Sequence, residues 1–136
     1  MKMLKIDLKS TERQELINLT DDLEKLIEES NVSEGICILF NPHTTAALTL
    51  NSRVDPTTAA DVVEELDRVI PTRVDFHHVF DTPSDAAGHI KSSFIGNHLT
   101  MLISDSKLQL GGSQGVFFWE FDGPRERKFL VKIIEI

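Results

Sequence analysis

The run from Gly35 to Phe40, with the sequence GICILF, constrains the fold more than any other segment. It has the length of a β-strand and no polar residue, a pattern that indicates a strand buried on both faces. Residues 4–8 differ, because leucine and isoleucine there alternate with lysine and aspartate, which is the period of a half-buried strand. We expect residues 14–18 to form the antiparallel neighbour of that strand.

Two longer segments have the start and stop signals of helices. Thr20 is expected to cap a helix that runs to about residue 30, because acidic residues follow it at the positive end of the helix dipole. Asp55 followed by Pro56 predicts a second start, since proline fits the first helical position. Apolar residues then recur at helical spacing until Pro71.

A short third helix is expected to begin at Ser84 or Asp85 and to end at Gly96. The predicted strands outnumber the helices, and strands and helices do not alternate strictly. Further strands are expected at residues 46–50, 98–104, 108–110, 116–121 and 128–136. We therefore predict an α+β fold in one domain over residues 1–136, with a mainly antiparallel sheet or a two-sheet sandwich and two to three helices.

Charge and cysteine content narrow the classes of partner and compartment. The formal net charge is −8, which argues against broad binding of nucleic acids and against docking on an anionic membrane surface. No stretch approaches the roughly 18 apolar residues of a transmembrane helix. The single cysteine, Cys37, cannot form an internal disulfide, so we expect a cytoplasmic protein.

Histidines are the most informative polar residues, because a neutral imidazole can both ligate a metal and carry a proton. His43 follows a buried strand and precedes Thr44 and Thr45. From these residues alone, two interpretations are open. His43 is either a rigidly supported reactive side chain or a histidine satisfied by the threonine hydroxyls.

A second group of candidates surrounds the predicted third helix. Asp85 and His89 are four residues apart and therefore share one helix face, where the carboxylate could orient the imidazole or ligate a metal beside it. The alternative is that Asp85 only caps the helix. His77 and His78 are adjacent in a loop, and adjacent residues usually point apart. At most one of them is expected to enter a site with His43.

Several polar residues suit an anionic ligand. Lys91 and Ser92 follow His89 on the same helix, and the glycine-rich turn Gly111–Gly115 offers backbone amides. Arg125 follows a predicted hairpin turn and could clamp a ligand. The alternatives are a solvated helix lysine, a simple turn and a charged hairpin rim.

The ordered set of these segments resembles the YjbQ-type (UPF0047) family, whose members are described as secondary thiamine-phosphate synthases. The resemblance covers nearly the whole chain. Its pieces are His43-Thr44-Thr45, Asn51, Asp55-Pro56, Asp61, His78, Asp85, His89-Ile90-Lys91-Ser92-Ser93, Gly96, Leu110-Gly111, Gln114-Gly115 and Asp122-Gly123-Pro124-Arg125.

The resemblance implies a compact homotrimer in which His43, His78 and His89 meet in a pocket near a subunit boundary, with His77 outside it. These three histidines are then the expected ligands of a divalent metal, with zinc as the candidate, and Asp85 joins them as a catalytic or orienting residue. The implied substrate is a small phosphorylated metabolite, in a transfer that joins a pyrimidine diphosphate to a thiazole phosphate. Its expected contacts are Thr44, Thr45, Asn51, Lys91, Ser92, Gln114 and Arg125.

The chain departs from the family pattern at two places. Ser52 stands where an acidic residue usually follows the asparagine, and Gly112-Ser113 stands where the family usually has Thr-Trp. An acidic charge and a large apolar surface are therefore missing, so a changed substrate or a reduced activity is expected. Three functions follow: an enzyme acting on a phosphate-bearing metabolite, a non-catalytic trimeric module that binds a metabolite or anion, or a purely structural role for the histidines in a subunit interface.

Overall fold

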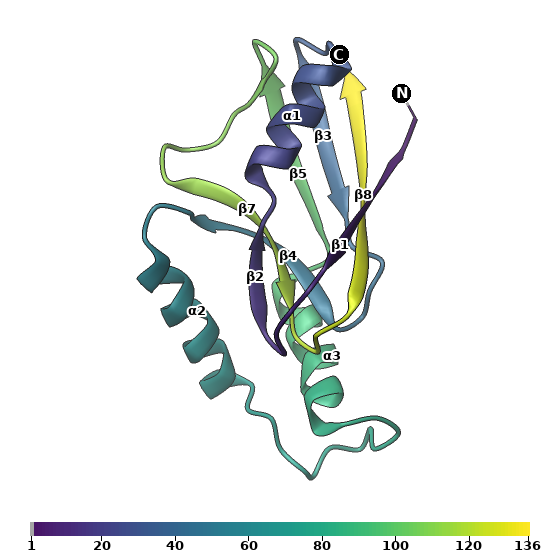
Figure 1. The fold of residues 1–136 in the computed structure, drawn as a ribbon, viewed down its shortest axis with the longest axis vertical. Coiled ribbons are helices and arrows are strands. Elements are labelled where there is room, and N and C mark those ends of the chain that lie inside the picture. Colours follow the sequence, from purple (N-terminus) through teal and green to yellow (C-terminus); the bar gives the residue numbers. More distant parts are fainter. Residues whose placement is uncertain (1) are drawn as a thin grey trace.

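The computed structural model describes residues 2–136, which form two antiparallel sheets and three helices (Figure 1). The larger sheet has five strands in the order β1-β8-β3-β5-β6. Their bounds are β1 Leu4–Lys9, β8 Glu126–Glu135, β3 Gly35–Phe40, β5 His98–Ser104 and β6 Lys107–Leu108. The smaller sheet has the order β2-β7-β4, with β2 at Glu15–Asn18, β7 at Gln114–Glu120 and β4 at Ala46–Ser52. The α+β prediction is confirmed.

The main core fills the space between the two sheets and helix α1, Thr20–Ser30. Leu23 and Ile27 of α1 are fully buried against it. The inward side chains of the larger sheet and of β7 complete this core, among them Leu39, Phe129 and Phe118. The side chains that alternate inward along β1 and β8 and the apolar face of α1 therefore pack into one shared apolar layer.

The other face of the smaller sheet carries a second apolar cluster of Ala47, Trp119 and Phe121. Helix α2, Pro56–Val69, contributes Val62, Val63 and Leu66, and helix α3, Pro83–Ile95, contributes Ile95. The smaller sheet is thus covered on both faces, and α3 lies against β4 (Figure 1). Within residues 2–136, none of these helices combines the length and apolarity that a bilayer crossing requires.

The pairing predicted for residues 14–18 is wrong. Strand β2 pairs with β7, from Glu15 opposite Glu120 to Asn18 opposite Phe117, whereas β1 pairs with β8. Ser10, between the two strands, donates to the carboxylate of Glu120 and accepts from the amide of Arg125. With these contacts, the chain passes from the larger sheet to the smaller one and does not fold back as a hairpin.

The prediction that residues 35–40 are buried on both faces is also wrong. Cys37 and Leu39 are fully buried, but Ile36 and Ile38 are only partly buried and Phe40 is 42% exposed. The strand is central in its sheet and still has one face that no other element of residues 2–136 covers. A continuous apolar run indicates two apolar faces, and only tertiary structure decides what covers each.

Helix boundaries agree with the sequence at four of six ends. Asp55 caps α2 by accepting a hydrogen bond from the Thr57 amide at 2.9 Å, with Pro56 in the first turn, and α2 ends before Pro71. Gly96 ends α3 with a φ of 108°. The predicted caps of the other two helices are corrected: Leu19, without a side-chain hydrogen bond, precedes α1, and Thr82, not Ser84 or Asp85, caps α3.

Candidate functional site

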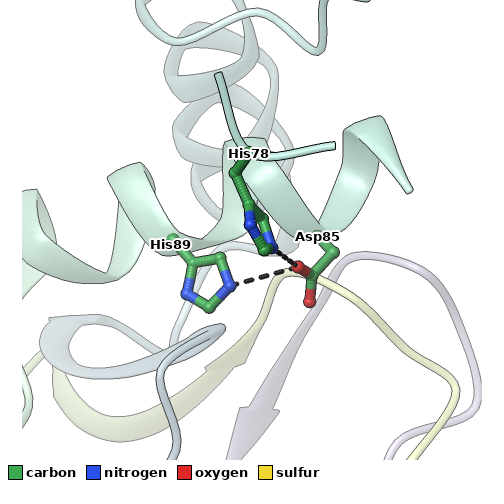
Figure 2. A group of neighbouring side chains, drawn as sticks. All are labelled: His78, Asp85 and His89. Carbon is green, nitrogen blue, oxygen red and sulfur yellow. Dashed lines mark hydrogen bonds and ion pairs between the residues drawn. The ribbon is translucent and has the colours of Figure 1, made fainter. Parts of the chain in front are cut away.

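Two imidazoles converge on one buried carboxylate at the start of α3 (Figure 2). Asp85 lies in the first turn of α3 and His89 one turn later, so both project from the same face. His78 comes from the loop between α2 and α3. The Nε2 atoms of His78 and His89 lie 3.0 Å and 3.1 Å from Oδ2 of Asp85. The two rings meet edge to face, with centroids 5.1 Å apart.

Asp85 is held in place from several sides. Only 6% of the residue is exposed, and its backbone amide donates to the Thr82 hydroxyl at 3.1 Å. Burial by itself would raise the pKa of the Asp85 carboxyl. The hydrogen bonds from His78 and His89 outweigh burial and hold the pKa below its usual value. Asp85 is therefore an ionised acceptor, and both imidazoles donate their Nε2–H to it.

Small residues on α3 bring the cluster close to β4. Ala86, Ala87 and Gly88 are buried in the first half of the helix. A Cβ atom on Gly88 would lie 3.3 Å from the side chain of Thr45 and 3.4 Å from that of Phe121. The helix therefore approaches the sheet as closely as a glycine allows, and this approach places His89 beside the segment that carries His43.

The donor atoms of His78, Asp85 and His89 fit a small divalent cation. All three ligand atoms lie within 4.8 Å of one another. Tetrahedral zinc with bonds of about 2.0 Å would place neighbouring ligand atoms about 3.3 Å apart. The separations of 3.0 and 3.1 Å between imidazole nitrogen and carboxylate oxygen are close to that value. Two imidazoles and one carboxylate are also a donor set that zinc accepts.

His43 lines a pocket with His89 but is not part of this ligand group. The pocket has a volume of about 380 Å³, and its remaining lining residues are Thr44, Ser92, Ser93, Gly96 and Asn97. The Nε2 atom of His43 instead accepts a hydrogen bond from the backbone amide of Lys128 at 3.0 Å. The structure thus brings two of the three predicted imidazoles to Asp85 and places the third across the adjoining pocket. His77 is exposed and outside the cluster.

The two substrate contacts predicted on α3, Lys91 and Ser92, both donate to other groups of the protein. Lys91 is 1% exposed, and its Nζ donates to Asp67 of α2 at 2.5 Å. Ser92 lines the pocket but donates its hydroxyl to the carbonyl of Ala46 at 2.7 Å. The pocket lining described above contains no lysine and no arginine. Lys91 therefore ties α3 to α2 and does not line this pocket.

The other predicted substrate contacts are spread over the molecule. Asn51 and Gln114 lie where β4 pairs with the start of β7, six residues and about 20 Å along the strand from Thr45. Gln114 uses its side-chain oxygen to accept from the Gly111 amide at 2.8 Å. Arg125 pairs with Asp122 at 2.8 Å, which raises the pKa of its guanidinium, and the charge of Asp85 adds to this in smaller measure.

Sequence reasoning missed the residues that hold the His43 segment. Arg127 donates from Nε at 2.8 Å and from Nη2 at 2.5 Å to the fully buried carboxylate of Glu120, and Nη2 also donates to the Thr45 hydroxyl at 2.8 Å. The Asn41 side chain bonds to the backbone of His43 on both sides. Two features of the sequence could have indicated these residues. Glu120 is an acidic residue inside the apolar run 116–121, and Asn41 directly precedes a proline.

Comparison with known proteins places the whole chain in one group. The sequence pattern of the family described as UPF0047 protein YjbQ-like matches residues 4–136. A UPF0047 protein of Methanocaldococcus jannaschii is 45% identical over 135 residues, covering 98% of this chain and 96% of that one.

Solved structures agree in fold. The crystal structure of an uncharacterised YjbQ/UPF0047 protein of Clostridium acetobutylicum, 40% identical, superposes with a TM-score of 0.90 over 96% of this chain and 99% of that one. A YbjQ-like protein of unknown function from Sulfolobus solfataricus, 27% identical, gives 0.92 over 99% and 97%. The chain therefore belongs to the UPF0047 family of YjbQ-like proteins.

Proposed function

We propose that this protein is a small-metabolite enzyme that acts on a phosphate-bearing substrate beside a divalent cation, with zinc as the candidate, held by His78, Asp85 and His89. The observation that supports this most is the convergence of two imidazole nitrogens on one buried carboxylate oxygen at 3.0 and 3.1 Å. The transfer implied by the family resemblance, in which a thiazole phosphate is joined to the pyrimidine and the diphosphate of the pyrimidine substrate is released, is the reaction we propose to test first.

The charge of the neighbouring pocket supports a role for a cation. The lining residues of the pocket offer hydroxyls, imidazoles, a side-chain amide and backbone groups, and none is a lysine or arginine. Gly96 and Asn97 also place the pocket at the C-terminal end of α3, where the helix dipole disfavours an anion. A cation bound at the cluster would supply the positive charge that polarises phosphate oxygens.

The residues of the chain have separate tasks in this proposal. Without a metal, ionised Asp85 accepts the Nε2–H of both rings and keeps them in place. With a cation bound, the two neutral rings would carry their proton on Nδ1, so that both Nε2 atoms and Oδ2 would face the cation. Thr82 fixes the backbone of Asp85. The Thr44 hydroxyl lines the pocket, where it can donate to a substrate oxygen.

Metal analysis of protein purified without a histidine tag tests the proposal. We expect one zinc per chain in the wild type, and loss of zinc in His89→Ala and in Asp85→Asn. His77→Ala is the matched control, because His77 is an exposed histidine in the same loop as His78. The formation of product from the pyrimidine and thiazole phosphates is then compared with and without zinc. Full activity in zinc-free protein would refute the proposal.

A binding module without turnover is the alternative. The open surroundings of Gly112 support it, because no atom of the described residues lies within 4 Å of a Cβ built there, where the family usually places bulkier residues. A thermal-shift screen with thiamine precursors, run beside the turnover assay, separates the two functions. Stabilisation without product would favour binding alone.

We also propose that the protein is a homotrimer, as its family resemblance implies. Ile36, Leu102 and Ile134 are cross-strand neighbours on the outer face of the larger sheet, and Leu102 is 63% exposed. An exposed apolar patch on a sheet face is typical of an interface between proteins. Light scattering should give the mass of a trimer for the wild type and a smaller mass for Leu102→Glu. With a net charge of −8, we expect no nucleic-acid partner.

A further inference from the structure

The hydrogen bond between His43 and Lys128 determines which nitrogen of the His43 ring carries the proton. The partner of Nε2 is a backbone amide, at 3.0 Å, and a backbone amide can only donate. A ring nitrogen that accepts a hydrogen bond has no proton of its own. The neutral His43 ring must therefore carry its proton on Nδ1.

The fold holds this ring orientation firmly. Pairing between β3 and β8 ends where Phe40 faces Leu130, and the Lys128 amide lies two residues beyond that pair. Because the chain bends away after Phe40, no further residue of β3 meets this amide, and the imidazole of His43 accepts its hydrogen bond instead. The ring also meets Phe118 edge to face, with centroids 6.4 Å apart.

The backbone around His43 is fixed by one side chain. Oδ1 of Asn41 accepts from the His43 amide at 2.9 Å, and Nδ2 donates to the carbonyls of His43 at 3.2 Å and Ala46 at 2.8 Å. Asn41 is 2% exposed, so these bonds are shielded from water. The bend therefore presents His43 in one orientation before any ligand arrives.

The charges around the ring favour its neutral form. Burial, followed by the positive charge of Arg127, lowers the pKa of His43, and Lys128 acts in the same direction. The Lys128 amide donates to the lone pair of Nε2, which also favours the neutral ring. Only the charge of Glu120 acts in the opposite direction among the causes at this ring, and the net shift of the pKa is downward. The ring is then neutral at pH 7, with its one proton on Nδ1.

We propose that His43 binds the ligand of the pocket as a fixed Nδ1–H donor to an anionic oxygen and is not a metal ligand. Within residues 2–136, Nδ1 makes no hydrogen bond, and the ring lines the pocket that it shares with His89. The identity of the ligand as a phosphate rests on the proposed function, whereas the protonation of the ring does not. A metal at His78, Asp85 and His89 and a donor at His43 would then contact the same anion from two sides of the pocket.

Nitrogen-15 NMR of histidine-labelled protein tests the assignment directly. We expect the His43 signals, identified by their loss in His43→Phe, to show a protonated Nδ1 and an unprotonated Nε2 in zinc-free protein. Adding one equivalent of zinc should shift the Nε2 signals of His78 and His89 strongly and leave that of His43 nearly unchanged. A protonated Nε2 on His43, or a zinc-induced shift as large as that of His89, would overturn the proposal.

Binding measurements separate the roles of the two groups. In His43→Phe loaded with zinc and then desalted, we expect unchanged zinc stoichiometry and inorganic phosphate binding weakened about three- to tenfold, the effect of one lost hydrogen bond. His77→Ala is the control and should bind phosphate as the wild type does. Loss of zinc in His43→Phe would overturn the proposal and leave the metal site standing. Absence of zinc from the wild type would instead refute the proposed function, and the NMR of the metal-free protein would still decide the role of His43.

If His43→Phe does not fold, the wild-type spectrum decides alone, with the signals assigned through His77→Ala, His78→Ala, His89→Ala and His98→Ala.

Discussion

Replacing Arg127 by methionine should destabilise the fold by about 3–5 kcal/mol, the usual cost of leaving a buried charge without its partner. The side chains of Glu120 and Arg127 are 0% and 5% exposed, so water cannot replace the lost contacts. The guanidinium makes two hydrogen bonds to the Glu120 carboxylate and two to Thr45, one to its hydroxyl and one to its carbonyl. Among residues 2–136, the donors that the carboxylate then keeps are both neutral, the Ser10 hydroxyl and the Asp122 amide.

Urea unfolding followed by the fluorescence of the buried Trp119 measures this loss at pH 7. The control is Arg68→Met, because Arg68 forms ion pairs on the surface with a side chain that is 63% exposed, and such pairs are worth less than about 1 kcal/mol. The double variant Glu120→Leu/Arg127→Met should recover most of the stability, since an apolar pair can replace a buried ion pair. A loss in Arg127→Met no larger than in Arg68→Met would refute the reasoning.

The pH dependence provides a second check, with a definite sign. In the wild type, burial alone would raise the pKa of Glu120, but the bonds from Arg127 and Ser10 outweigh it and hold the pKa below the usual 4.5. Glu120 therefore contributes stability that is present above the unfolded-state pKa and is lost as the pH falls through the lower folded-state pKa. In Arg127→Met, no positive charge opposes the effect of burial, so the pKa of Glu120 rises. Protonation of Glu120 then removes the unpaired buried charge. The deficit of the variant should shrink between pH 7 and about pH 5, and a constant deficit would contradict this account.

Two further substitutions test packing and the support of the site. Gly35→Ala should lower the free energy of unfolding by about 1–3 kcal/mol or more, because its Cβ would lie 2.1 Å from the Ile134 carbonyl oxygen. Gly112→Ala is the control and should leave the unfolding midpoint unchanged, because its Cβ meets no atom of residues 2–136 within 4 Å. Equal midpoints for the two variants would contradict the close β3–β8 contact. Thr82→Ala removes the cap of α3 and should cost about 1 kcal/mol of stability. Because the Thr82 hydroxyl accepts from the Asp85 amide, zinc affinity should fall about tenfold as well, and an unchanged affinity in a zinc titration would show that Asp85 needs no such support.

The sequence by itself determined the features that depend on neighbours along the chain. Alternation in residues 4–8 and helical spacing after Pro56 gave a strand and a helix where the structure has them. The spacing of Asp85 and His89 fixed their common face, because a helix brings residues four apart together whatever surrounds it. The order of motifs also indicated the family.

Tertiary structure alone decided every feature that joins distant segments. The loop that carries His78 has no period, so nothing local indicates that its imidazole meets Asp85. Lys91 has the spacing of a pocket residue, yet α2 supplies Asp67 as its partner. The amide that fixes the His43 ring is 85 residues away in sequence. Periodicity reports which face of an element is apolar, whereas the partner of each polar atom is set by the packing of elements against one another.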